Sequence, residues 1–241
     1  MQIHTKVIVL RTVRYGDAKM VVDMFTESHG RLSFAVTVSK TGRGRMRKQL
    51  FQPLMLLEAV LDYRPNRQLQ RLADVRLQRP LPGLLADPCK VALALFLAEF
   101  ISYATRCEQQ NVPLFRYMAC GVEWLDGALG SVANFHVVFM LRMVRFLGFE
   151  PNMDTYADGR WLDMRGGVFT PLRPLHPDVV EPAEARLIPT LMRIDYRSMH
   201  LCRMSRQERN RCVRLILDYC RLHLPSFPEL RSLDVLSELW S

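Results

Sequence analysis

The chain has 241 residues, of which 49% are hydrophobic and 24% are charged. This is ordinary usage for a folded globular protein, and it excludes a collagen-like, fibrous or largely disordered chain. The sequence contains no apolar run long enough to cross a bilayer and no leader-like N-terminus, so we expect neither secretion nor membrane insertion.

The positive charge is unevenly distributed along the chain. Residues 1–80 contain 15 Lys and Arg against 6 Asp and Glu, a net charge of +9, whereas the other 161 residues contain 18 of each. Because the electrostatic field depends on the local density of charge, this pattern predicts that the N-terminal third binds a polyanion such as nucleic acid. Two alternatives stay open: a soluble domain that is simply rich in Arg, and a domain that binds an anionic membrane surface.

The first eighty residues are predicted to form strands, because apolar and β-branched residues alternate between short turns. A basic loop that contains two glycines, residues 39–48, follows the third strand. Five short strands with a long loop after the third predict a small β-barrel. The predicted strands cover residues 7–12, 20–26, 31–38, 51–60 and 69–77.

The periodicity becomes helical after the Pro80-Leu81-Pro82-Gly83 segment. Asp87-Pro88 is a typical helix start, because Asp caps free N–H groups and Pro needs no donor in the first turn. Ser205 and Glu208 have the spacing of a capping box. Predicted helices begin at Asp87, Pro113 and Asn134, the last ending at Gly148, and further helices cover residues 182–193, 205–222 and 232–240.

Together these patterns predict an α+β chain with two domains. Residues 1–80 would form the five-stranded barrel, and residues 81–241 a helical domain. An irregular insertion rich in Pro and Gly, at about 150–182, is expected to contain short strands near Trp161 and Val168.

Six cysteines occur in the chain, and no two of them form a close pair in the sequence. Most lie among apolar residues of predicted helices, where a free thiol behaves as a small hydrophobic group. We therefore expect six structural thiols and a reducing cytoplasmic location. The cysteines are Cys89, Cys107, Cys120, Cys202, Cys212 and Cys220.

Several blocks of the sequence resemble the RecO family of recombination proteins. The first is KVIVLRTVRYGDAKMVVDMFTESHGRLSFAV at residues 6–36, followed by the basic loop and Phe51-Gln52-Pro53-Leu54. The helical blocks DPCKVALALFLAEF, VPLFRYMACGVEWL and FMLRMVRFLGFEP follow in the order typical of the family. No block is specific alone, but their order and spacing extend over nearly the whole chain.

The resemblance implies an N-terminal OB-fold followed by an α-helical domain. It further implies binding to single- and double-stranded DNA, annealing of complementary strands, and partnership with RecR and the single-stranded DNA-binding protein SSB. In the family this activity helps to load RecA onto SSB-coated DNA. A nucleoid-associated protein without cofactors is therefore expected.

One departure from the family concerns zinc. Some RecO-like proteins carry a cysteine-ligated zinc module after the Gly-Phe-x-Pro turn, but the corresponding segment here, FEPNMDTYADGRWLDMRGGVFTPL, contains no Cys. A structural zinc site needs about four Cys or His ligands, and His176 is the one candidate nearby. We therefore predict no metal site, and a hairpin or loop in its place.

The basic loop is the strongest candidate for DNA contact, because spaced Arg and Lys side chains can reach several phosphates at once. A solvated loop without a ligand is the alternative. The candidate residues of the loop are Lys40, Arg43, Arg45, Arg47 and Lys48, and the patch is expected to extend to Arg11, Arg14, Lys19, Arg31, Arg64, Arg67 and Arg71. Among the aromatic residues, Tyr15 and Tyr63 are the candidates for stacking on bases.

A second basic group lies between residues 192 and 221. Eight arginines and three acids give it a net charge of +5, but helical geometry does not align the arginines in one stripe. This group either adds to DNA binding or forms a solvated helix surface. Its arginines are Arg193, Arg197, Arg203, Arg206, Arg209, Arg211, Arg214 and Arg221.

A third candidate site is a peptide-binding surface on the predicted helix at 134–147. Arg142 and Arg145 lie three residues apart beside Phe139 and Phe146. Such a surface is predicted to bind an acidic, hydrophobic peptide that ends in a carboxylate, and the resemblance identifies the C-terminal tail of SSB as such a peptide. An ordinary core helix with two surface arginines is the alternative.

No catalytic signature is found: the chain has no Walker A loop, no GxSxG, no HExxH and no tight cluster of acids. We therefore expect a protein that is not an enzyme. Other hypotheses are a general nucleic-acid-binding OB protein without mediator activity, a transcriptional or scaffold protein, and an unrecognised nuclease.

Overall fold

The structure is a computed structural model that describes residues 2–15, 19–37 and 48–238. The chain divides into two compact units. Unit 1 comprises Met1–Ala128 and Glu229–Ser241, and unit 2 comprises Leu129–Pro228. The predicted division at residues 80 and 81 falls where the strands end, whereas unit 1 continues through three more helices. That two-domain division stays a prediction.

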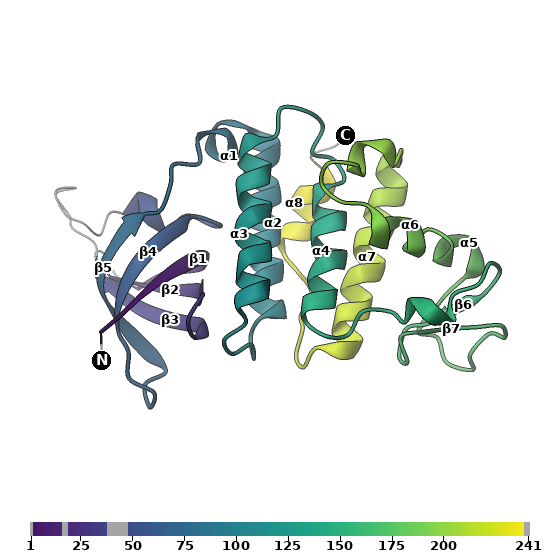
Figure 1. The fold of residues 1–241 in the computed structure, drawn as a ribbon, viewed down its shortest axis with the longest axis horizontal. Coiled ribbons are helices and arrows are strands. Elements are labelled where there is room, and N and C mark those ends of the chain that lie inside the picture. Colours follow the sequence, from purple (N-terminus) through teal and green to yellow (C-terminus); the bar gives the residue numbers. More distant parts are fainter. Residues whose placement is uncertain (1, 16–18, 38–47, 239–241) are drawn as a thin grey trace. The chain divides into compact units, whose positions relative to one another are not determined.

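Unit 1 begins with a closed five-stranded barrel, in the strand order β1-β2-β3-β5-β4 (Figure 1). Only β3 and β5 pair in parallel; the other described pairs are antiparallel. This is the predicted barrel, an OB-fold, and the prediction is confirmed. The strands are β1 (Gln2–Arg14), β2 (Lys19–Thr26), β3 (Gly30–Thr37), β4 (Leu56–Asp62) and β5 (Leu69–Leu77).

The interior of the barrel follows the alternation of the sequence. Val22, Met24 and Phe34 are fully buried, as are Val7 and Val9 of β1. A bulge lies between Val9 and Arg11. Because a bulge adds one residue to its strand, the side chains of β1 after the bulge face the same side of the sheet as their partners on β2.

The predicted strand at 51–60 is wrong at its start. Phe51 ends a short 3₁₀ helix, η1 (Lys48–Phe51), and the strand begins only at Leu56. Two features interrupt the extended chain: Pro53 has no N–H donor, and Leu54 adopts a left-handed conformation with φ 62°. The Leu54 N–H donates to the Val9 carbonyl at 2.8 Å instead.

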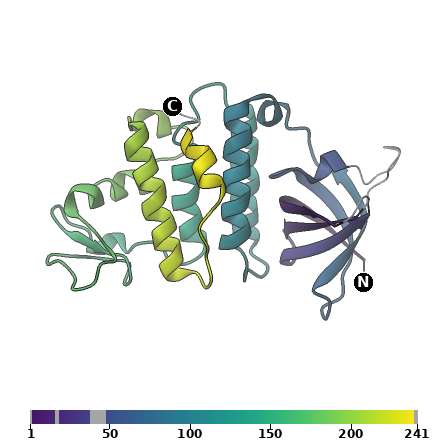
Figure 2. The same cartoon turned by 180° about the vertical axis from the view of Figure 1, so that it is seen from behind.

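Helices complete unit 1: α1 (Pro82–Ala86), α2 (Pro88–Ala104), α3 (Val112–Gly127) and α8 (Ser232–Glu238). α2 packs against β1, and α8 packs against α2 (Figure 2). The predicted cap is confirmed, since the Asp87 carboxylate accepts from the backbone N–H of Cys89 at 2.8 Å. The sequence patterns missed α1, which is only five residues long.

Unit 2 consists of helices and a small sheet. The main helices are α4 (Phe135–Phe146) and α7 (Arg206–His223), and the predicted capping box of Ser205 and Glu208 is present at the start of α7. The predicted helix over 182–193 is two short helices, α5 (Pro182–Ala185) and α6 (Ile188–Arg193), because Pro189 lacks the N–H donor of a continuous helix and starts α6 instead. 3₁₀ turns cover Met153–Thr155 (η2) and Met199–Leu201 (η3).

The irregular insertion forms a three-stranded sheet in the order β7-β6-β8. Its strands are β6 (Trp161–Asp163), β7 (Val168–Thr170) and β8 (Val179–Val180). The predicted strands near Trp161 and Val168 are therefore confirmed. Buried side chains of Leu162, Phe169 and Val180 form the core beneath this sheet.

Candidate nucleic-acid interface

One outer face of the barrel gathers exposed cations. The register aligns Arg11, Asp23 and Ser33 across β1, β2 and β3, and Ala35 with Arg71 across β3 and β5. Side chains alternate along a strand, so these residues share the outer side of the sheet. Arg11, Lys19 and Arg71 are exposed there.

Two of these three cations lie opposite an acid in the strand register, Arg11 opposite Asp23 and Arg71 opposite Asp62. In the part of the chain that the structure describes, no ion pair joins Arg11, Lys19 or Arg71 to a carboxylate. Exposed apolar side chains, Val13 and Leu69, lie on the same face. The face therefore offers cations for phosphates and apolar surface for sugars or bases.

Another face of the barrel is electrostatically mixed. Lys6, Glu58 and Arg76 are aligned across β1, β4 and β5, and Arg76 donates to Glu58 at 2.7 Å. Glu27 and Asp74 line a surface pocket together with these three residues. Because its cations are neutralised by neighbouring acids, this face is a weaker match to a polyanion than the face of Arg11, Lys19 and Arg71.

Arg31 differs from the other predicted DNA-binding cations in its surroundings. Its side chain is 15% exposed and forms an ion pair with Asp23 at 3.1 Å. It also donates to the carbonyl oxygen of Ser102 in α2. Arg31 therefore connects the barrel to α2, and its guanidinium group is engaged with Asp23 and Ser102.

The remaining predicted cations lie at two ends of the barrel. Lys19 is aligned with Thr37, the last residue of β3, and Arg14 is aligned with Met20. Arg64 and Arg67 lie in the turn between β4 and β5, and the start of β5 pairs with the middle of β3 at Ser33–Ala35. Of the loop, Lys48 is described and exposed, whereas Lys40, Arg43, Arg45 and Arg47 lie outside the described residues.

The turn with Arg64 and Arg67 is held by a buried side chain. Gln70 is 2% exposed, accepts from the Arg64 N–H at 2.9 Å and donates to the carbonyls of Arg64 and Arg67. These hydrogen bonds fix the backbone of the turn, and Arg64 and Arg67 are exposed. The turn therefore presents two exposed cations between β4 and β5.

The two candidate stacking residues differ in their surroundings. Tyr15 is 71% exposed beside Lys19, with its N–H bonded to the Lys19 carbonyl at 2.9 Å. Tyr63 is half-buried, and its ring centre lies 4.3 Å from that of His29. Of these two residues, Tyr15 has the exposure that stacking on a base requires.

Two family models match the chain. The model described as Recombination protein O N terminal matches residues 1–81, and Recombination protein O C terminal matches residues 85–234. The chain belongs to the RecO family of DNA repair proteins. It is 47% identical over 234 residues to the DNA repair protein RecO of Bacteroides fragilis and 46% to that of Phocaeicola vulgatus, in each case over 97% of both chains. The RecO of Christiangramia forsetii is 30% identical over the full length of both chains.

In this RecO-family chain the residues predicted to form a peptide surface on α4 differ in their exposure. Phe139 is fully buried and packs near Phe135, so its side chain cannot contact a peptide. Arg142 donates from Nε and Nη2 to the Ile194 carbonyl at 3.3 and 3.1 Å. Arg145, which lies 3.7 Å from Glu150, and the 37% exposed Phe146 are the predicted residues that stay at the surface.

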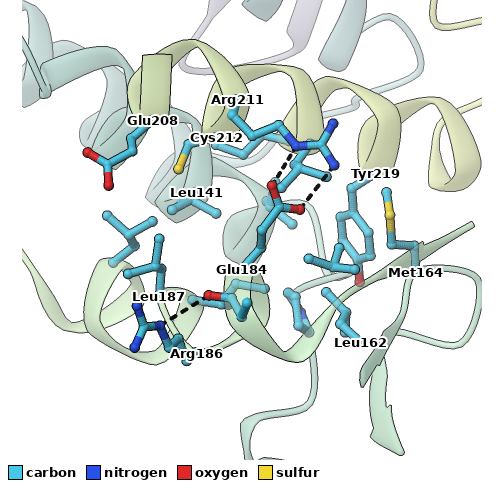
Figure 3. Close-up of a pocket in the computed structure, with 18 of the residues that line it drawn as sticks. Leu141, Leu162, Met164, Glu184, Arg186, Leu187, Glu208, Arg211, Cys212 and Tyr219 are labelled. Atoms are coloured by element: carbon cyan, nitrogen blue, oxygen red, sulfur yellow. Dashed lines mark hydrogen bonds and ion pairs between the residues drawn. The ribbon is translucent and has the colours of Figure 1, made fainter. Parts of the chain in front are cut away.

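Unit 2 contains an apolar pocket that sequence reasoning missed (Figure 3). Its volume is about 390 Å³, and α4, α5, α6, α7 and the small sheet line it. Glu184 and Arg211 face each other in this pocket, joined by two hydrogen bonds of 2.7 and 3.0 Å. Its apolar lining includes Leu141, Val144, Leu162, Leu187, Ile188 and Leu191.

Nothing in the described parts of the chain fits the zinc module of other RecO-like proteins. No group of three or more His, Cys, Asp or Glu residues is placed to hold a metal ion within residues 2–15, 19–37 and 48–238. In the segment that would hold the module, His176 pairs with Asp163 at 3.2 Å and has no further ligand-type neighbour. In the same described ranges, no helix is long and apolar enough to span a membrane.

Proposed function

We propose that this RecO-family protein is a non-enzymatic recombination mediator that binds single- and double-stranded DNA and anneals complementary strands. The exposed cations of the barrel face, Arg11, Lys19 and Arg71, support this proposal. Together with the basic loop they would bind phosphates without reading the sequence of bases.

Annealing needs a surface of this kind. Two strands repel each other through their phosphates, and cations on the protein screen this repulsion. The bases must stay free to pair, so a surface with one exposed aromatic ring, Tyr15, is better suited than a row of stacking platforms. Double-stranded product is tolerated because its backbone offers the same phosphates.

The salt dependence of DNA binding tests this assignment. The measurement is the slope of log Kd against log salt concentration for a 30-nucleotide single strand. The triple variant Arg11→Ala, Lys19→Ala, Arg71→Ala is expected to lower this slope by about 2, because each lost phosphate contact removes about 0.7. Arg76→Ala is the matched control, because Glu58 already neutralises Arg76. Equal slopes for the triple variant and the wild type would contradict the assignment.

We further propose that the protein acts on the chromosome in the cytoplasm with RecR and SSB and helps RecA to load onto SSB-coated DNA. Unit 2 would supply the docking of the SSB tail. The apolar pocket favours this role, because an apolar terminal side chain would fit among Leu187, Ile188 and Leu191. Arg186 also lines the pocket, is exposed, and could pair with the terminal carboxylate of the peptide.

A labelled peptide copied from the last ten residues of the cognate SSB distinguishes the two surfaces of unit 2. Leu187→Asp and Arg186→Glu are expected to weaken binding about tenfold, because one places a charge in the pocket and the other removes the partner of the carboxylate. Arg145→Glu with Phe146→Ala is the matched control on α4. Loss of binding in that control alone would move the site to α4.

A further inference from the structure

Two charged side chains in the apolar pocket of unit 2 are paired with each other. Glu184 lies on α5, and Arg211, a member of the second basic group, lies on α7; both line the pocket (Figure 3). Arg211 donates from Nε and Nη2 to the two carboxylate oxygens of Glu184, at 2.7 and 3.0 Å. A guanidinium group binds carboxylates in general with this bidentate geometry. Glu184 therefore occupies the donors that a carboxylate of a ligand would use.

The other two charged side chains that line the pocket, Arg186 and Glu208, have different surroundings. The Glu208 carboxylate accepts from the Ser205 N–H at 2.7 Å, and hydrogen bonds from Ser205 lower the pKa of Glu208. Glu208 is thus an anion that is bound to the start of α7. Arg186 is exposed. Of the two acids in the lining, Glu184 is therefore the one that holds an arginine of the pocket.

The exposure of the pair makes an exchange of partners inexpensive. The side chain of Arg211 is 55% exposed and that of Glu184 is 33% exposed. An ion pair this open to solvent adds little to stability, because water and salt screen it. The hydrogen bond to Glu184 raises the pKa of Arg211, so the arginine carries its charge throughout the physiological pH range. A ligand that brings a carboxylate into the pocket can therefore replace Glu184 as the partner of Arg211.

We propose that Glu184 is an internal competitor of the ligand: it holds Arg211 until an acidic peptide in the pocket displaces it with a side-chain carboxylate. This inference rests on the proposed docking of the SSB tail and adds a control of its affinity. Competition by Glu184 weakens the binding of every acidic peptide, so apolar contacts within the pocket must supply the difference. An acidic segment without an apolar side chain to fill the pocket is therefore rejected.

The test measures the binding of two labelled peptides to the full chain. One copies the last ten residues of the cognate SSB, and the other replaces each acidic side chain of that peptide by its amide and keeps the terminal carboxylate. Glu184→Gln is expected to bind the acidic peptide about threefold to fivefold more tightly than the wild type, as an exposed ion pair allows, and to bind the amide peptide equally well. An equal gain for both peptides would overturn the proposal, because it would show that the substitution only opens the pocket.

Asp178→Asn is the matched control. Asp178 pairs with Arg165 at 2.7 Å, their side chains are 31% and 55% exposed, and neither residue lines the pocket. This variant changes the net charge by the same amount as Glu184→Gln and is expected to leave both affinities unchanged. A gain equal to that of Glu184→Gln would overturn the proposal in favour of a general charge effect.

A second variant shows whether Glu184 acts through Arg211. In an Arg211→Gln background, Glu184→Gln is expected to give no further gain for the acidic peptide, and a gain that persists there would overturn the proposal. Urea midpoints equal to that of the wild type show that the variants are folded. If neither the wild type nor any variant binds the acidic peptide, the proposed docking of the SSB tail fails. If the wild type binds it and Glu184→Gln has the same affinity, this inference alone fails.

Discussion

Arg31 and Asp23 form an ion pair of 3.1 Å across β2 and β3, and each side chain is 15% exposed. Asp23 also accepts from the Ser33 hydroxyl at 2.5 Å, while Arg31 donates to the Ser102 carbonyl. The sequence places Arg31 among the DNA-binding cations, but this network gives it a structural role. It connects β2 and β3 with α2.

Removal of Arg31 is expected to affect stability and to leave DNA binding almost unchanged. Arg31→Ala leaves the Asp23 carboxylate with the Ser33 hydroxyl as its remaining side-chain donor and removes a donor from the Ser102 carbonyl, which costs about 2–3 kcal/mol in the free energy of unfolding. Arg11→Ala, on the open surface, is expected to cost about 0.5 kcal/mol or less. Urea unfolding gives both values, and a loss of salt slope in folded Arg31→Ala would restore Arg31 to the DNA-binding set.

Gly30 marks a close approach between the β2–β3 turn and the segment after α2. Its φ is +67°, and a Cβ atom added there would lie 2.2 Å from the carbonyl oxygen of Gln109. Gly30→Ala therefore combines about 1 kcal/mol of backbone strain with a displacement of this segment. Gly159→Ala is the control for strain alone, because Gly159 has φ +79° and open space around it. Equal losses of unfolding free energy in the two variants would contradict the close approach.

His136 should make unit 2 sensitive to acid. Burial, and then the charge of Arg209, lowers the pKa of His136 from 6.5 to about 3. The unfolded chain takes up a proton below pH 6.5 and the folded chain does not, so stability is fully present above that pH and falls as the pH decreases toward 3. Between pH 7 and 5 the loss is about 2 kcal/mol.

His136→Gln, which does not titrate, tests this sign. It is expected to flatten the pH dependence of the urea midpoint between pH 7 and 5, whatever its stability at pH 7. A slope equal to that of the wild type would show that another group is responsible.

The six thiols should fall into separate reactivity classes. Cys107 and Cys120 are exposed, whereas Cys212 and Cys220 are buried, and burial raises the pKa of Cys212 to about 11 and that of Cys220 to about 12. The thiolate is the reactive form, so the buried pair should resist a thiol reagent at pH 8 until the chain is unfolded. Mass spectrometry of the labelled peptides gives the order of reaction, and early labelling of Cys220 would contradict its burial.

Local patterns were sufficient for much of the fold. The alternation of β2 and β3, the Asp87 cap and the Ser205 capping box depend on residues a few positions apart, so a sequence shows them directly. The roles of Arg31 and Arg142 depend on the carbonyls of Ser102 and Ile194, which lie 71 and 52 residues away. No local pattern contains that information. Similarly, the pocket in unit 2 is formed by several short elements that meet only in the fold.

The most direct test of the central claim is the rate at which two complementary oligonucleotides, coated with the cognate SSB, anneal without ATP. The wild type is expected to accelerate annealing. A folded variant with Arg43, Arg45, Arg47 and Lys48 all changed to Ala is expected to lose most of this acceleration, because these are the residues of the basic loop that are predicted to bind phosphates. A folded wild type that binds DNA and leaves the annealing rate unchanged would contradict the mediator function.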